Sequence, residues 1–353
     1  MKNIAIVVTS LSFGGAERFV ITLYNMLIQL GYNVTILLIC NKIDYEISDV
    51  KYYTLDNEIT LKYKFLKPYF LQKYIETHHI DLIIDNRTRL SFFKTIVYEF
   101  FLRKVKKVKI IHANKLDVYL FSNKFITENI YNRYKKIICI NTEMQSLVLS
   151  KYKLKNVITI YNPIPEIDNS DADIAIKESF ILFFGRIDNQ SKDLLFLLES
   201  YKKSELIGKN IQLVILGSGP DLLGVKNKAQ ELKITNYVNF IPATSNPFPY
   251  VKRAMFTVIT SNYEGFCLAA LESIAIGTPV VSVNYGKIAT EIIQNQHNGL
   301  LVDKDMNKFI NALNLMATDK ELREYCKKNG PVSVNQFNKE NIVLLWKKAL
   351  ENI

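Results

Sequence analysis

Cysteine is scarce in this sequence, and its four copies are scattered, with no pair at CxxC spacing. They stand mostly among apolar residues, which predicts buried thiols in a reducing compartment rather than disulfides or a zinc site. Long apolar runs are also lacking, since no stretch of about 18 consecutive apolar residues occurs. These absences speak against a disulfide-stapled secreted domain and against a membrane-spanning protein.

Acidic residues are outnumbered, with 34 Asp and Glu against 45 Lys and Arg, which gives a formal net charge of +11. Between Phe101 and Lys136, ten basic residues stand against two acidic ones, a net +8. Tyr119, Phe121 and Phe125 lie within this run. Such a run is either a solvated basic face or a surface for nucleic acid or an anionic membrane. Because no nucleic-acid module is visible, we expect an anionic membrane surface and no nucleic acid.

The first residues, MKNIAIVVTSLSFGG, hold a short β-branched run that ends in glycines. This pattern predicts a strand rather than a secretory signal. We therefore expect a cytoplasmic protein that is peripheral on the inner face of the cytoplasmic membrane. The residues expected to contact the lipid include Lys104, Lys106, Lys107 and Lys109, with the three aromatic side chains inserting beside them.

Strand-like runs alternate with helical patterns through both halves of the chain, which predicts doubly wound α/β domains with parallel sheets. The expected strands are NIAIVV, NVTILLI, IDLIID, VKIIH, KIICIN and VITIY, then FILFFG, IQLVILG, YVNFI, MFTVIT, TPVVSV and GLLV. A proline-containing, acidic stretch separates the two sets. The predicted division is an N-terminal Rossmann-like domain (1–163), a linker (164–179), a C-terminal Rossmann-like domain (180–335) and a closing helix (336–353). Two such sheets facing each other leave a cleft for a ligand.

Two glutamates, Glu264 and Glu272, stand eight residues apart in an otherwise apolar segment, EGFCLAALE. We expect Glu264 at the start of a helix and Glu272 about two turns inside it, so that the carboxylates are about 12 Å apart along the axis. The free N–H groups of the helix start suit a diphosphate. The carboxylates accept hydrogen bonds from sugar and ribose hydroxyls. The alternative is a charge at the helix start and a paired acid inside it.

Two further segments have the character of phosphate-binding loops. In FFGRIDNQSK, Gly185, Arg186 and Lys192 follow a strand, and two cations at the mouth of a parallel sheet suit a pyrophosphate. In SFGGAER, Gly14 and Gly15 stand between the first strand and the first helix, where backbone N–H groups approach a phosphate closely. Each feature alone is weak evidence for a phosphate site, because glycine pairs usually form turns and such cations are usually solvated.

Taken in order, GGAER, YNPI, GRID with its lysine, LVILGSGP, the E-x7-E segment, GTPVVS and NGLLV resemble the retaining GT-B glycosyltransferases, in particular the large bacterial family 4. The chain looks most like enzymes that extend lipid-linked oligosaccharides, lipopolysaccharide or capsule. The resemblance implies a ribose contact at Glu272, a donor-sugar contact at Glu264, and neutralisation of the leaving diphosphate by Arg186 and Lys192. The residues expected at the donor site are Gly14, Gly15, Gly185, Arg186, Lys192, Glu264, Gly265, Phe266, Cys267, Leu268 and Glu272.

The resemblance further implies transfer of a hexose or N-acetylhexosamine from a nucleotide sugar, expected to be a UDP sugar, to a lipid-linked or oligosaccharide acceptor. His112, at the end of the strand VKIIH, is expected on the acceptor side, with a structural histidine as the alternative. No cofactor and no metal are expected. The D-x-D triplets at 171–173 and 303–305 are interpreted as solvated acids. In GTPVVSVNYGK a single glycine, Gly286, stands where many relatives have a pair.

Two other functions remain open at this stage. A sugar-nucleotide epimerase has the same fold, and a non-catalytic partner of a transferase complex has a similar binding site. The joint presence of Glu264, Glu272, Arg186 and Lys192 favours the transferase over the non-catalytic partner. Turnover of donor with any acceptor, or isomerised free sugar nucleotide, distinguishes these possibilities.

Overall fold

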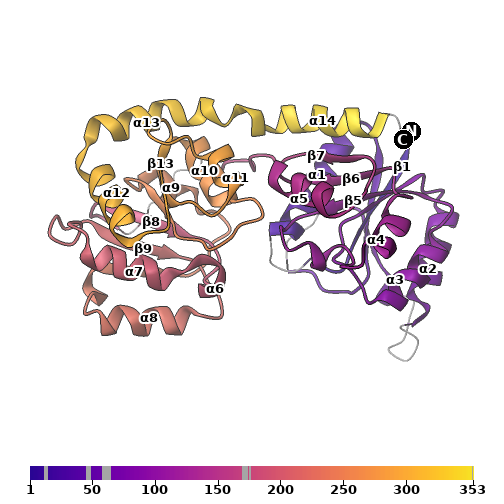
Figure 1. Ribbon diagram of the computed structural model, residues 1–353, viewed down its shortest axis with the longest axis horizontal. Coiled ribbons are helices and arrows are strands. Elements are labelled where there is room, and N and C mark those ends of the chain that lie inside the picture. Colours follow the sequence, from indigo (N-terminus) through magenta and orange to yellow (C-terminus); the bar gives the residue numbers. More distant parts are fainter. Residues whose placement is uncertain (12–14, 45–48, 58–64, 169–173, 175, 352) are drawn as a thin grey trace. The chain divides into compact units, whose positions relative to one another are not determined.

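The computed structural model describes residues 1–353 except 12–14, 45–48, 58–64, 169–173, 175 and 352. It divides into two compact units, shown in Figure 1. Unit 1 consists of Met1–Pro163 and Lys339–Ile353, and unit 2 consists of Ile164–Asn338. Each unit is an α/β structure built on its own parallel sheet.

The sheet of unit 1 has seven strands in the order β3-β2-β1-β4-β5-β6-β7. All of its pairings are parallel. The strands are rich in β-branched residues and are buried nearly throughout, as expected for a sheet that is covered on both faces. The strands are β1 (Asn3–Val8), β2 (Asn33–Leu38), β3 (Tyr52–Thr54), β4 (Leu82–Asp85), β5 (Lys106–Ile111), β6 (Lys136–Cys139) and β7 (Val157–Thr159).

The helices of unit 1 follow its strands, and most bury an apolar stripe against the sheet. In the first helix the buried residues include Val20, Leu23 and Leu27, and Gly31 in a left-handed conformation (φ 81°) lies just beyond its end. The helices are α1 (Gly15–Gln29), α2 (Lys67–Thr77), α3 (Phe92–Phe101), α4 (Lys124–Tyr131), α5 (Thr142–Lys151) and α14 (Lys339–Glu351).

The sheet of unit 2 has six parallel strands in the order β10-β9-β8-β11-β12-β13. The strands are β8 (Phe180–Phe184), β9 (Gln212–Leu216), β10 (Val238–Ile241), β11 (Thr257–Ile259), β12 (Val280–Val283) and β13 (Gly299–Val302). The helices are α6 (Asn189–Lys192), α7 (Leu194–Lys203), α8 (Leu222–Glu231), α9 (Phe248–Arg253), α10 (Leu268–Ile276), α11 (Lys287–Ile292), α12 (Met306–Thr318) and α13 (Lys320–Ser333).

The boundaries differ from the sequence prediction in two places. The closing helix is not a separate element, because α14 belongs to unit 1, where Trp346 is fully buried and the Lys2 ammonium donates to the carbonyl of Leu350 (3.2 Å). The segment predicted as a linker is assigned to unit 2, and Ile174 within it packs in the same apolar cluster as Phe180 and Leu182.

Both sheets have a topological switch point, where the strand order reverses and the loops at the carboxyl ends diverge. In unit 1 it lies between β1 and β4, and in unit 2 it lies between β8 and β11. Ligands of open α/β sheets bind at such points, outside the carboxyl ends of the strands. The loops after β8 and β11 carry Arg186, Lys192 and Glu264. The topology therefore gives these residues a common location in unit 2.

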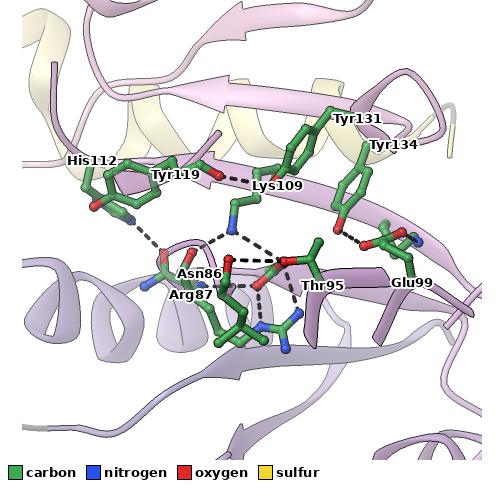
Figure 2. Close-up of polar contacts among 12 residues, drawn as sticks. Asn86, Arg87, Thr95, Glu99, Lys109, His112, Tyr119, Tyr131 and Tyr134 are labelled. Atoms are coloured by element: carbon green, nitrogen blue, oxygen red, sulfur yellow. Dashed lines mark hydrogen bonds and ion pairs between the residues drawn. The ribbon is translucent and has the colours of Figure 1, made fainter. Parts of the chain in front are cut away.

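The structure buries part of the basic run of unit 1 that the sequence suggested as a lipid-facing surface, whereas Lys104 and Lys106 are exposed. Lys107 and Lys109 on β5 are buried, and so are Tyr119 and Phe121, whereas Phe125 is exposed. The Lys109 ammonium donates to the carbonyl of Arg87 (2.5 Å; Figure 2). It also pairs with the Asp85 carboxylate (3.3 Å). Lys107 and Lys109 stand two residues apart on β5, so they point to the same, covered side of the sheet, and Tyr119 and Phe121 are buried after the strand. These four side chains are therefore unavailable to lipid.

The buried charges of this region compensate one another. The Arg87 guanidinium binds Asp85 (2.8 Å) and the Lys107 ammonium binds Glu99, which also accepts a hydrogen bond from the Tyr134 hydroxyl (2.7 Å). Burial raises the pKa of Asp85, but the charges of Arg87 and Lys109 outweigh this effect and hold the pKa well below its ordinary value. Buried ions are tolerated only when paired in this way. Among the described residues, no helix is both long and apolar enough to cross a membrane.

Candidate functional site

The clearest arrangement of charged side chains in unit 2 lies at its switch point. The Lys192 ammonium at the end of α6 contacts the Glu264 carboxylate in the loop after β11, with 2.5 Å between Nζ and Oε1. The Ser261 hydroxyl donates to the same oxygen (2.6 Å). The Lys192 side chain is 23% exposed and that of Glu264 is 11% exposed. A cation and an anion that are 72 residues apart in sequence are thus neighbours at the sheet edge.

Backbone and side-chain hydrogen bonds hold the two loops together. The Asn262 N–H donates to the carbonyl of Ser191 (2.8 Å), and the Asn262 side-chain amide donates to the carbonyl of Gln190 (2.9 Å). The Thr260 hydroxyl donates to the carbonyl of Lys192 (2.8 Å). These bonds fix the position of Lys192 independently of its own ion pair.

The electrostatics of Lys192 favour a permanent charge. Burial lowers the pKa of the Lys192 ammonium, but the Glu264 carboxylate more than offsets this, so the pKa is raised above its ordinary value. The charged form therefore persists at neutral pH. A fixed cation at the carboxyl edge of a sheet is suited to an anionic ligand group.

Arg186 lies on the same side of the sheet, directly after β8, and its side chain is 68% exposed. Its nearest recorded charge is Asp188, at 3.9 Å, so the guanidinium is largely solvated. Gly185 precedes it with a φ of 140°, a conformation that side chains disfavour. The loop therefore presents an accessible cation beside the more buried Lys192.

The segment LGSGP contributes two glycines that sequence reasoning did not assign to the site. A Cβ at Gly217 would lie 1.9 Å from the carbonyl oxygen of Gly185, and a Cβ at Gly219 would lie 2.0 Å from that of Ile187. The Ile187 N–H donates to the carbonyl of Ser218 (2.9 Å). The loop after β9 thus supports the loop that carries Arg186, and only glycine permits this approach. The G-x-G spacing was the available signal.

The two glutamates of the E-x7-E segment do not share a helix, which corrects the sequence prediction. Glu264 lies in the loop, and α10 begins four residues later, at Leu268. Glu272 is the fifth residue of α10, about one turn in rather than two, and is 4% exposed. The spacing of 12 Å expected from a continuous helix therefore does not apply. The loop instead lets Glu264 reach Lys192.

The residues between the two glutamates line the start of α10. Gly265 and Leu268 are partly buried, while Phe266 and Cys267 are buried. Cys267 occupies the N-cap position, and its own side chain makes no capping hydrogen bond. Burial raises the pKa of the Cys267 thiol to about 12, so it stays protonated at neutral pH. Tyr285, which sequence reasoning did not single out, is buried beside this thiol.

His112 lies in unit 1, directly after β5, and is buried. Its Nε2 is 2.6 Å from the amide oxygen of Asn86, which follows β4 at the switch point of that sheet (Figure 2). Burial, together with the nearby charge of Lys109, lowers the pKa of His112 to about 3. The ring is therefore neutral at pH 7. Because an amide oxygen only accepts, Nε2 carries the proton and Nδ1 keeps its lone pair.

The structure describes the glycine pair at 14–15 and the two D-x-D triplets only in part. Gly15 is the first residue of α1, whereas Gly14 lies outside the described residues, as does the triplet at 171–173. In the second triplet, Asp303 pairs with Lys308 (2.6 Å), and Asp305 accepts from the N–H of Lys308 (2.9 Å) and thereby caps α12. This triplet thus has a local structural role.

Comparison with known proteins identifies the two halves of the chain separately. Residues 13–166 match the family described as Glycosyltransferase Family 4, and residues 166–332 match Glycosyl transferases group 1. Together the two matches extend over both units.

Two relatives from Campylobacter jejuni match almost end to end. One, named N-acetylgalactosamine-N,N'-diacetylbacillosaminyl-diphospho-undecaprenol 4-alpha-N-acetylgalactosaminyltransferase, is 28% identical over 97% of this chain and 97% of its own. The other, named GalNAc-alpha-(1->4)-GalNAc-alpha-(1->3)-diNAcBac-PP-undecaprenol alpha-1,4-N-acetyl-D-galactosaminyltransferase, is 24% identical over 100% of this chain and 99% of its own.

The fold has counterparts among solved structures. Anabaena Alr3699/HepE, in a crystal structure with UDP and glucose, matches with a TM-score of 0.79 over 100% of both chains, at 15% identity. The two relatives are named as transferases, which favours transfer over the epimerase alternative. The strand order, the two family matches and the full-length relatives lead to one conclusion: this chain belongs to the GT-B glycosyltransferases, with a family 4 domain followed by a group 1 domain, and is a hexosyltransferase.

Proposed function

We propose that this enzyme transfers a hexose or N-acetylhexosamine from a UDP sugar to a growing lipid-linked glycan in surface polysaccharide biosynthesis, with retention of the anomeric configuration. The observation that carries the proposal is the Lys192–Glu264 pair at the switch point of unit 2, with Arg186 exposed beside it. The undecaprenol acceptors named for both relatives support a lipid-linked acceptor. The UDP and glucose named for the Anabaena structure support the donor class.

Lys192 and Arg186 are the groups that bind the diphosphate in this proposal. A diphosphate carries more negative charge than one carboxylate, so it competes with Glu264 for the Lys192 ammonium. Glu264 is then released to accept a hydrogen bond from a hydroxyl of the donor sugar. The resting ion pair therefore keeps both groups in place until the donor arrives. Glu272 remains the predicted partner of the ribose.

The reaction breaks the bond between the anomeric carbon and the β-phosphate oxygen of UDP, and forms a bond from that carbon to the acceptor hydroxyl oxygen on the same face. The departing phosphate oxygen accepts the hydroxyl proton. Negative charge grows on the diphosphate as the bond breaks, and the positive charges of Lys192 and Arg186 stabilise it more strongly in the transition state than in the ground state. No cofactor takes part in this scheme.

Turnover measurements test the proposal. Purified protein is incubated with a panel of nucleotide sugars and a polyprenyl-diphosphate-linked saccharide, and both transfer and hydrolysis are followed. Lys192→Ala and Arg186→Ala should each lower kcat about 100- to 1,000-fold, the usual loss for one charge-stabilising group. Lys308→Ala removes an exposed lysine paired in the same unit and serves as the matched control. Near-normal rates in both site variants would place the diphosphate elsewhere, and isomerised nucleotide sugar would indicate an epimerase.

A further inference from the structure

Helix α3 of unit 1 buries side chains that carry polar groups and exposes apolar ones. Its inward stripe, at the spacing i, i+3, i+4, consists of Thr95, Tyr98 and Glu99, and all three are buried. Surface helices of globular proteins normally bury the apolar stripe and expose the polar one. On α3 the buried Glu99 carboxylate binds the Lys107 ammonium and accepts a hydrogen bond from the Tyr134 hydroxyl. Its charge is therefore compensated inside the unit.

The outward stripe of α3 is wholly apolar. Its members are Phe93, Ile96, Val97 and Phe100, again at i, i+3, i+4 and i+7, and each is exposed, from 42% for Val97 to 80% for Phe93. Isolated exposed apolar residues are common, but an ordered stripe of four on one helix face marks an interaction surface. We call these four residues the α3 stripe.

Aromatic side chains of neighbouring elements contact the residues at both ends of α3. Towards α2, the half-exposed Tyr69 ring lies 6.4 Å from that of Phe101, and Figure 1 shows α2 and α3 next to each other. At the first residue of α3, Phe92 contacts the buried Phe121, with 5.8 Å between their ring centroids.

Within α3 and its flanking residues, the exposed charges are of one sign. Across residues 91–104 the exposed charged side chains are Lys94, Arg103 and Lys104, while the one acid of that segment, Glu99, is buried and paired. The Arg103 guanidinium lies over the Phe100 ring, at 4.7 Å from its centroid. A second copy of this chain would bring like charges together at this face.

From this pattern we infer that the α3 stripe is the surface by which the enzyme inserts into an anionic lipid bilayer. A bilayer offers an apolar interior for the four side chains and a negative headgroup layer for the cations that flank them. This assignment replaces the buried Lys107, Lys109, Tyr119 and Phe121 as lipid contacts. The inference rests on the proposed function, because a lipid-linked acceptor is the reason for the enzyme to bind a membrane. Membrane binding itself is measured without any sugar.

Flotation with vesicles tests the inference on the full-length protein. Wild type should bind vesicles of phosphatidylglycerol mixed with phosphatidylcholine and should be released by added salt. Phe93→Ser with Phe100→Ser should lower partitioning about 100-fold, since each ring contributes roughly tenfold or more. Charge reversal of Lys94, Arg103 and Lys104 to glutamate should lower it by at least about 100-fold.

Matched controls lie in unit 2. Leu223→Ser changes a 71% exposed apolar residue, and Lys202→Glu reverses an exposed cation. Both should bind as wild type does. A Phe93→Trp variant adds a second reporter, because its emission should shift to the blue and be quenched by brominated lipid upon binding, whereas the buried Trp346 should respond to neither.

Three results would overturn the inference: no binding of wild type to anionic vesicles at low salt, binding that the α3 variants leave intact, or a dimer that these variants dissociate in the absence of vesicle binding. Transfer to a water-soluble acceptor analogue separates this inference from the proposed function. The α3 variants should keep that activity while losing turnover of acceptor in vesicles. Vesicle binding by a wild-type protein that transfers no sugar would reject the proposed function and leave the surface assignment standing.

Discussion

The stability of unit 1 should depend on pH through His112. Burial and the nearby Lys109 lower the pKa of His112 to about 3, whereas a histidine in an unfolded chain has a pKa of about 6.5. Between these values the unfolded chain binds a proton that the folded protein does not. Stability is therefore present in full above pH 6.5 and falls as the pH drops toward 3. At pH 5 the loss is about 2 kcal/mol, because each pH unit below 6.5 contributes about 1.4 kcal/mol.

The single tryptophan of the chain makes this loss measurable in unit 1 alone. Trp346 lies fully buried in α14, which belongs to that unit, so its fluorescence reports the unfolding of unit 1 in urea. The free energy of unfolding is measured at pH 7 and pH 5 for wild type and for His112→Gln, which keeps a donor for Asn86 but does not titrate. Wild type should lose about 2 kcal/mol more than the variant. Equal losses in the two proteins would show that His112 is protonated in the folded state and would refute the reasoning.

Three further changes have defined outcomes. Gly219→Ala should destabilise unit 2 by about 1–3 kcal/mol, because the added Cβ would overlap the carbonyl oxygen of Ile187, and faster hydrogen exchange of β8 and β9 measures this. Glu99→Gln should lower the stability of unit 1 by about 3–5 kcal/mol in the tryptophan assay, since it leaves a buried lysine unpaired. Glu272→Gln should weaken binding of free UDP, whereas Glu264→Gln should bind UDP at least as tightly as wild type, because it removes the carboxylate that competes for Lys192, and should impair turnover of the UDP sugar; equal losses of UDP affinity would contradict their separate roles.

Much of the fold follows from periodicity in the sequence. Each of the twelve expected strand segments overlaps a strand of the structure, because β-branched apolar runs between helical patterns are characteristic of buried parallel strands. The missed strand, β3, has three residues, Tyr52–Thr54, and pairs at the sheet edge, where a short run carries no periodic signal. The return of α14 to unit 1 was also missed, since an amphipathic pattern does not reveal which core a helix covers.

The sequence singles out the charged residues of the candidate site, but it does not show which of them form an ion pair. The E-x7-E spacing and the GR–K segment identified Glu264, Arg186 and Lys192, yet nothing in the sequence shows that Lys192 meets Glu264, because their loops are brought together by the order of β8 and β11. The assumption of one helix from Glu264 to Glu272 was wrong, since the chain runs as a loop up to Cys267.

The membrane surface shows the limit of counting charges along a chain. Lys107 and Lys109 contribute to the basic run in sequence, but their partners Glu99 and Asp85 lie on α3 and β4, so both lysines turn inward. The same pairing explains α3, whose inner face must carry an acid to neutralise a buried lysine. Its apolar residues are therefore left on the outside.

The diphosphate site is tested most directly by titrating UDP into the protein in a calorimeter, in the presence of a chelator because no metal is expected. Wild type should bind UDP under these conditions. Lys192→Ala should weaken binding by at least about 30-fold, since it removes a partly buried cation and leaves the Glu264 carboxylate facing the diphosphate. Lys308→Ala should bind as wild type does. Equal UDP affinity in Lys192→Ala and wild type, or binding that the chelator abolishes, would contradict a metal-free diphosphate site at the β8–β11 edge.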